Sequence, residues 1–195
     1  LELRGAGNLL GTEQSGHMLS VGYELYCKML EEAVDKLNGK ETVQQAEETA
    51  FSLPIPAIIS KRYIENEVLR LQMYKKIAMV ENDEDESEVI DELMDRFGDI
   101  PKATMNLIKI SKIRAMARKM GVSEILQQGY KLIFKLWENM KFDQNMMAQL
   151  ISVYGGKLMI NGGSEPYIRL TVNKDDPLIT IEKFLQTALN EKKLS

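Results

Sequence analysis

The apolar pattern of the chain changes at Gly121, and this change constrains the fold more than any other feature. Between residues 64 and 120, apolar side chains recur every three or four positions, the period of amphipathic helices. From residue 123 to 137 they alternate with polar ones, the period of strands. Helices followed by hairpins predict an α+β (mixed α/β) fold, with helices packed on a small, mainly antiparallel sheet.

Four helices are expected before this change, over about residues 17–37, 64–80, 82–97 and 102–120. Asn82 or Asp83 can cap the third helix, acidic side chains suit its first turn, and Gly98 can end it. Gly121 can end the fourth in the same way. The spacing predicts that the second helix turns Val68, Leu71, Tyr74 and Ile77 inward, and the third Val89, Ile90, Leu93, Met94 and Phe97.

Shorter elements are expected around and after these helices. A strand precedes the loop that Pro54 and Pro56 impose on "TAFSLPIPAII". The segment "SEILQQGYKLIFKLW" predicts a hairpin with its turn at Gln128-Gly129, followed by a helix capped by Asp143. The segments "KLMI" and "PYIRLTV" predict two more strands, and Asp176-Pro177 starts a final helix.

Composition limits the partners and the cellular compartment that fit the chain. The formal net charge is −4, so no overall positive field draws it to nucleic acid. Cys27 is the single cysteine, which excludes an internal disulfide and suits a reducing cytosol. No apolar run is long enough to span a membrane, and no signal pattern opens the chain. We therefore expect a cytoplasmic protein.

The glycine spacing of "GAGNLLG", near the start of the chain, is similar to that of a nucleotide-binding loop. A dinucleotide site needs a preceding strand and an acid at the end of a second strand. Only four residues precede this loop, and the acids at the right distance lie inside an expected helix. A Gly-Lys-Ser/Thr sequence is also missing. A stand-alone nucleotide-binding protein remains an alternative, while a flexible loop that grips or responds to a phosphate backbone fits the residues better.

No catalytic set or metal site emerges from the remaining residues. His17 has no second ligand nearby, and Cys27 has no partner base. The acidic run from Glu81 to Asp95 lacks the glycine and ligand spacing of a calcium loop, and reads as a solvated helix face or a site for a basic partner. We expect no bound cofactor.

The fourth helix is rich in basic residues. Four of them share one face: Lys102, Lys109, Lys112 and Lys119. They can pair with the acidic helix across "GDIP", or form a contact surface for DNA or an acidic partner. The domain shows no aromatic and basic stacking platform, so single-strand binding is not expected.

The opening stretch "LELRGAGNLLGTEQSG" resembles the motif that follows the last helicase motif in bacterial transcription-repair coupling factors. The segments "VGYELYCKMLEEAV", "RYIENEVLRLQMYKKIA" and "ELMDRFGDIP" extend this resemblance along the chain. From about residue 122 the resemblance is mostly one of element pattern.

The resemblance implies a function for each part of the chain. The family is an ATP-driven translocase on double-stranded DNA that displaces stalled RNA polymerase and recruits the excision-repair damage-recognition ATPase. ATP and magnesium would bind the motor, whose motifs are absent here. Residues 1–45 would then be the translocation motif and residues 46–195 a regulatory domain that masks the repair-protein binding module. The matching motif positions are Arg4, Gly5, Gly7, Gly11, Glu13, Gln14 and Gly16, with Arg4 and Gln14 as the working side chains.

Overall fold

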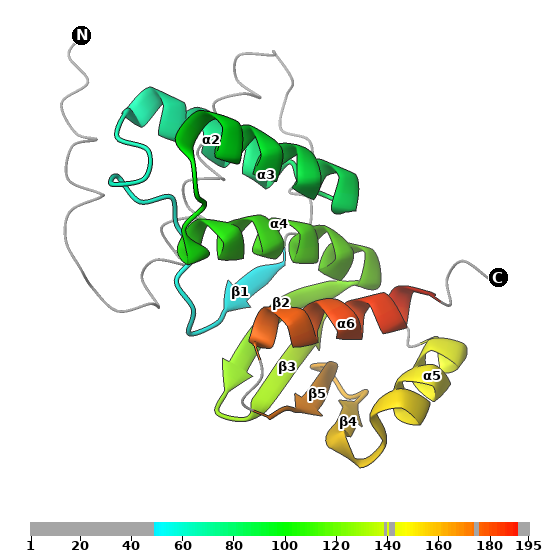
Figure 1. The fold of residues 1–195 in the computed structure, drawn as a ribbon. Helices are drawn as coiled ribbons and strands as arrows, with labels where there is room; N and C mark the ends of the chain where they lie inside the picture. Colours follow the sequence, from blue (N-terminus) through cyan, green and yellow to red (C-terminus); the bar gives the residue numbers. More distant parts are fainter. Residues whose placement is uncertain (1–48, 139, 141–142, 174–175, 191–195) are drawn as a thin grey trace, which may run out of the picture.

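The computed structural model describes residues 49–138, 140, 143–173 and 176–190 (Figure 1). Helices and a five-stranded, mostly antiparallel sheet make up this part, so the α+β prediction is confirmed. The glycine-rich segment, the expected helix over 17–37 and the expected boundary between residues 45 and 46 lie outside the described residues.

Three helices come first in the described part of the chain, and the last two end at the glycines predicted to end them. They are α2 (Glu67–Ala78), α3 (Asp83–Phe97) and α4 (Lys102–Met120). The Asn82 side chain caps α3 by accepting hydrogen bonds from two backbone N–H groups of its first turn, and Gly98 ends it. Gly121 ends α4 in the left-handed conformation, with φ of 85°.

The sheet contains β1 (Ala50–Ser52), β2 (Val122–Gln128), β3 (Lys131–Leu136), β4 (Leu158–Asn161) and β5 (Tyr167–Thr171). Its strand order is β1-β2-β3-β5-β4. β1 runs parallel to β2, and helices α2 to α4 form the long crossover that parallel pairing requires. The other neighbours are antiparallel, and the expected hairpin is confirmed. Its turn is at Gly129-Tyr130, one residue later than the predicted Gln128-Gly129, because Gln128 still pairs with Lys131.

Helices also follow the hairpin. They are α5 (Gln144–Tyr154), the short 3-10 helix η2 (Gly155–Lys157) and α6 (Pro177–Asn190). Side chains of α4, α5 and α6 meet one face of the sheet in a buried cluster, which we call the sheet core. Phe134 of β3 stacks on Phe184 of α6 at its centre, with ring centroids 4.3 Å apart.

A second buried cluster, the helical core, joins α2, α3 and the other side of α4. Met73, Ile77, Leu93 and Leu107 are completely buried in it. α4 therefore lies between the two cores and contributes side chains to both. This position explains why α4 is buried around most of its circumference although its sequence is rich in basic residues.

Two expectations about inward-facing residues are wrong. Val68 is 62% exposed and Met94 is 52% exposed. On α2 the buried positions are Arg70, Met73 and Ile77, a stripe rotated relative to the expected one. The Arg70 guanidinium donates a 2.8 Å hydrogen bond to the backbone oxygen of Ile64, which satisfies one of its N–H donors in a position where sequence patterns expect a solvent-exposed side chain.

Within the described residues, none of the helices has both the length and the apolar character needed to cross a membrane.

Candidate functional site

Four carboxylates lie along one side of α3: Glu84, Glu88, Asp91 and Asp95. Their spacing of four, three and four residues places them in a single row on the helix surface. All four residues are exposed, and none forms a salt bridge within the part of the chain that the structure describes. We call this row the acidic face.

The acidic face reduces the stability of the helix that carries it. Like charges one turn apart cost about 0.2–0.5 kcal/mol per pair. The positive end of the helix dipole offsets part of this cost near Glu84, but Asp95 lies in the last turn, where the dipole opposes a negative charge. A row of unpaired like charges that costs stability is the pattern expected of a surface that binds a cationic partner.

Glu92 lies on the same helix but does not belong to the acidic face. Lys76 of α2 and Arg96 of α3 both donate hydrogen bonds to its carboxylate. The hydrogen bond from Lys76 is the largest of the effects that hold the pKa of Glu92 below its ordinary value. This pairing joins α2 to α3, so the Glu92 charge is used within the domain.

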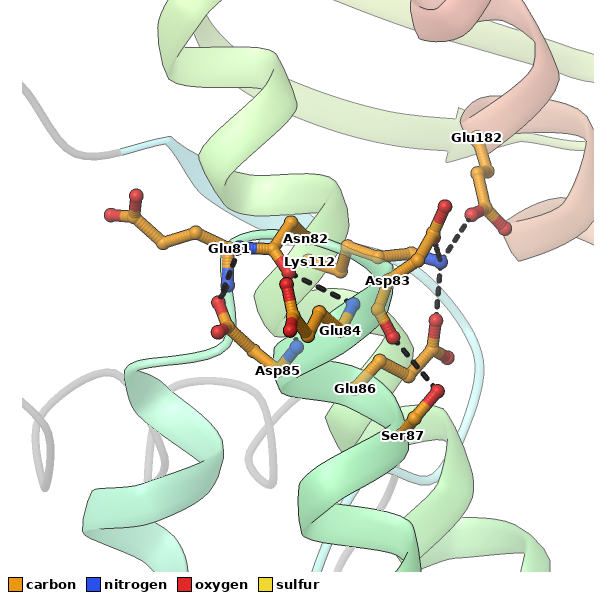
Figure 2. A network of polar contacts seen from close by, with 9 residues as sticks. All are labelled: Glu81, Asn82, Asp83, Glu84, Asp85, Glu86, Ser87, Lys112 and Glu182. Carbon is orange, nitrogen blue, oxygen red and sulfur yellow. Dashed lines mark hydrogen bonds and ion pairs between the residues drawn. The ribbon is translucent and has the colours of Figure 1, made fainter.

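A buried lysine fixes the start of α3. Lys112 in the middle of α4 is 6% exposed, and its Nζ lies 2.8 Å from Asp83 Oδ1 and 2.6 Å from Glu182 Oε1. It also donates to Glu86 Oε2. Figure 2 shows the three carboxylates converging on the ammonium group from α3 and α6. We call these four residues the lysine cluster.

The electrostatics of the lysine cluster favour the charged form of every member whose pKa is shifted. Burial alone would lower the pKa of Lys112, but hydrogen bonds to Asp83, Glu182 and Glu86 outweigh it and raise that pKa above its ordinary value. The hydrogen bond from Lys112, helped by its positive charge, holds the pKa of Asp83 below its ordinary value. Lys112 and Asp83 are therefore both ionised at neutral pH.

The same three carboxylates have the mutual spacing of metal ligands. Oxygens of Asp83, Glu86 and Glu182 lie within 4.8 Å of one another. The Lys112 ammonium lies among them, however, and supplies the positive charge that a cation would bring. The arrangement thus fits an internal ion cluster that holds α3, α4 and α6 together.

The structure separates the four lysines expected to share a basic face. Lys102 and Lys119 are exposed and Lys109 is half-buried, but Lys112 is buried in the lysine cluster. The inclusion of Lys112 in an exposed contact face is therefore corrected, because its ammonium is satisfied inside the domain. For Lys112 the structure shows the other predicted alternative, which is pairing with the acidic helix α3. A contact surface built from the other three lysines stays a prediction.

The expected translocation-motif residues Arg4, Gly5, Gly7, Gly11, Glu13, Gln14 and Gly16 lie outside the described residues. One residue of the lysine cluster, Glu182, was not identified from sequence. It belongs to α6, far from α3 and α4 in the chain, and no local pattern signals a contact between them.

Comparisons with known proteins place this domain in a family. Residues 53–147 match the family described as the TRCF domain. The transcription-repair-coupling factor of Staphylococcus haemolyticus is 35% identical over 193 residues, which are 97% of this chain and 16% of that protein. That of Mycobacterium bovis is 36% identical over 135 residues, which are 64% of this chain and 11% of that protein. The chain thus spans about 16% of the length of the staphylococcal relative.

A solved structure has the same fold. The crystal structure of the C-terminal domain of transcription-repair coupling factor superposes with a TM-score of 0.67 at 21% sequence identity. The match covers 76% of this chain and 96% of that one. The chain belongs to the transcription-repair coupling factor family and carries its C-terminal TRCF domain.

Proposed function

We propose that the chain is the C-terminal part of an ATP-driven translocase on double-stranded DNA that displaces stalled RNA polymerase and recruits excision repair. In this proposal the described domain is regulatory. It masks the module of the same protein that binds the damage-recognition ATPase, until the factor engages polymerase. Family membership supports the parent activity, and the surface of α3 supports the regulatory role.

The acidic face is the observation that carries this proposal. Masking needs a surface that binds protein reversibly and does no chemistry of its own. Glu84, Glu88, Asp91 and Asp95 form such a surface for a basic patch on the masked module. Exposed charge pairs contribute little free energy each and weaken further as salt rises. A contact built from them is therefore weak enough for a conformational change to release it.

The lysine cluster makes the acidic face suitable for a masking contact. It ties the first turn of α3 to α4 and α6, and α4 packs on both cores. The face is therefore held in one orientation before the partner arrives. Less conformational entropy is lost when a preorganised surface binds, so a contact of modest size suffices.

Residues 1–45 have a separate role in this proposal. They couple ATP hydrolysis to stepping along DNA, with Arg4 and Gln14 as the working side chains and with ATP and magnesium bound by the motor elsewhere in the parent protein. Arg4→Ala in the full-length protein should retain ATP hydrolysis and lose translocation. A variant that displaces polymerase at the normal rate would exclude this role.

Deletion tests the masking role. A full-length protein that lacks residues 46–195 should bind the damage-recognition ATPase more tightly than the intact protein does. Retained ATP hydrolysis shows that the motor of the deletion variant is folded. Unchanged affinity would mean that this domain does not mask the binding module.

A further inference from the structure

The sheet has a second face that no described helix packs against. The sheet core contains the residues of β2, β3 and β5 that face α4, α5 and α6, among them Ile125, Phe134 and Ile168. Figure 1 shows α4 and α6 along one side of the sheet. Because side chains alternate along a strand, the intervening residues point to the other side. The open face, as we call it, includes Glu124, Leu126, Lys131, Ile133, Lys135, Met159, Tyr167 and Arg169.

The middle row of the open face holds three apolar residues and one cation. Leu126 and Ile133 are direct cross-strand neighbours, and Arg169 and Met159 continue their row across β5 and β4. Met159 is 42% exposed, and Leu126 and Ile133 are half-buried without belonging to either core. A sheet that faces water on one side shows polar residues there, whereas the run Leu132-Ile133-Phe134 is typical of a strand covered on both faces.

The charges of the open face are mainly positive. Lys131, Lys135 and Arg169 contribute three cations, and Glu124 is the one acidic residue at its strand positions. Glu124 is neutralised by Lys135, whose Nζ lies 2.6 Å from its Oε2. Lys131 and Arg169 are left next to the apolar residues of this face, on a chain whose formal net charge is −4.

We propose that the open face docks an acidic amphipathic helix of a partner protein. Apolar side chains of such a helix would cover Leu126, Ile133 and Met159, and its carboxylates would meet Lys131 and Arg169. A second copy docked face to face would oppose cations to cations. Single-stranded nucleic acid needs several stacking aromatics, and Tyr167 is the one aromatic residue among the strand positions of this face. The surface is distinct from the acidic face of α3 and does not depend on the masking role.

Titration of the isotope-labelled chain with a synthetic helical peptide tests the inference. The peptide, of about 18 residues, carries leucine along one side and glutamate along the other. Saturable shifts of the methyl signals of Leu126 and Ile133 are expected, with little change in α2 and α3. A peptide with lysine in place of glutamate should bind about tenfold more weakly or not at all.

Paired variants separate docking from a general charge effect. Lys131→Glu with Arg169→Glu should weaken peptide binding about tenfold. Lys61→Glu with Lys183→Glu makes the same change in net charge at exposed positions off the sheet and should leave binding unchanged. Met159→Glu, at an exposed strand position, should also weaken peptide binding, although it leaves Lys131 and Arg169 in place. Circular dichroism confirms that each variant is folded.

Three results would overturn the inference. The first is no saturable shift of Leu126 and Ile133, and the second is an equal loss of binding in the control pair. The third is tighter binding of a single-stranded oligothymidine than of the acidic peptide at the same residues, which would make the open face a nucleic-acid surface.

Discussion

Lys112 Nζ lies 2.6 Å from Glu182 Oε1, and this ion pair joins the central helix α4 to α6, which packs on the sheet. The same ammonium binds Asp83 and Glu86 at the start of α3. One buried side chain therefore connects the helix that carries the acidic face to the layer built on the sheet. The stability of the domain and the orientation of the acidic face depend on the same contacts.

Removal of this charge should destabilise the domain strongly. Lys112→Met keeps most of the side-chain volume but leaves three carboxylates facing one another, two of them half-buried. Loss of one member of a buried ion cluster costs about 3–5 kcal/mol, and the exposure of Asp83 reduces this to about 2–4 kcal/mol here. Chemical denaturation measures the change in the free energy of unfolding.

Two further variants check the cause. Lys183→Met removes an exposed lysine of α6 and should change stability by less than about 0.5 kcal/mol. Addition of Glu86→Gln and Glu182→Gln to Lys112→Met should restore part of the loss, because the repulsion is removed. Equal stability of Lys112→Met and Lys183→Met would contradict the role given to the lysine cluster.

Stability should fall in acid through the paired carboxylates. The pKa values of Asp83 and Glu92 are lowered in the folded domain from ordinary values of 3.8 and 4.5. Groups with a lowered folded pKa contribute stability above their unfolded pKa and lose it as the pH falls through the folded one. The free energy of unfolding should therefore decrease from about pH 4.5 downward.

Denaturation curves at several pH values test this dependence. Asp83→Asn with Glu92→Gln should flatten it. Glu88→Gln, which removes an exposed carboxylate without an ion pair in the described part of the chain, should leave it in place. An unaltered slope in the double variant would show that these pairs do not account for acid sensitivity.

Gly121 should not tolerate a side chain. Its φ is 85°, and a Cβ there would lie 2.5 Å from Met140 Sδ. Gly121→Ala should cost about 1–3 kcal/mol, mainly from backbone strain because the Met140 side chain can move. Gly156→Ala is the matched control, since a Cβ there meets nothing within 4 Å. Similar melting temperatures for both variants would refute the assignment of strain.

The Asn82 cap should contribute measurably to α3. Its Oδ1 accepts hydrogen bonds of 2.9 Å from Glu84 N and 3.0 Å from Asp85 N. Asn82→Ala should destabilise the domain by about 1 kcal/mol, and Asn82→Gly by only a few tenths. Thermal unfolding distinguishes the two, and wild-type stability of Asn82→Ala would show that the cap is dispensable.

Local signals in the sequence predicted the elements well. Asn82, Gly98 and Gly121 act on the backbone of their own neighbourhood, so the ends of α3 and α4 could be predicted from them. The alternation after Gly121 likewise predicted the hairpin. The inward faces were harder, because Arg70 is buried through a hydrogen bond to Ile64 that periodicity does not reveal.

Features that depend on distant contacts could not be predicted. Lys112 was grouped with other lysines by its position on α4, and only the packing of α6 brings Glu182 to it. The open face also requires strand register, because β5 lies between β3 and β4 in space but follows both in the chain. Side chains from four strands form one surface that no single segment displays.

The most direct test of the masking proposal is charge reversal on the acidic face in the full-length protein. Glu88→Lys with Asp91→Lys should raise affinity for the damage-recognition ATPase toward that of the protein lacking residues 46–195. The control, Glu138→Lys with Glu165→Lys, reverses two exposed acids outside α3 and should bind as the wild type does. Unchanged affinity of the α3 variant, while the deletion still raises it, would contradict the assignment of masking to the acidic face.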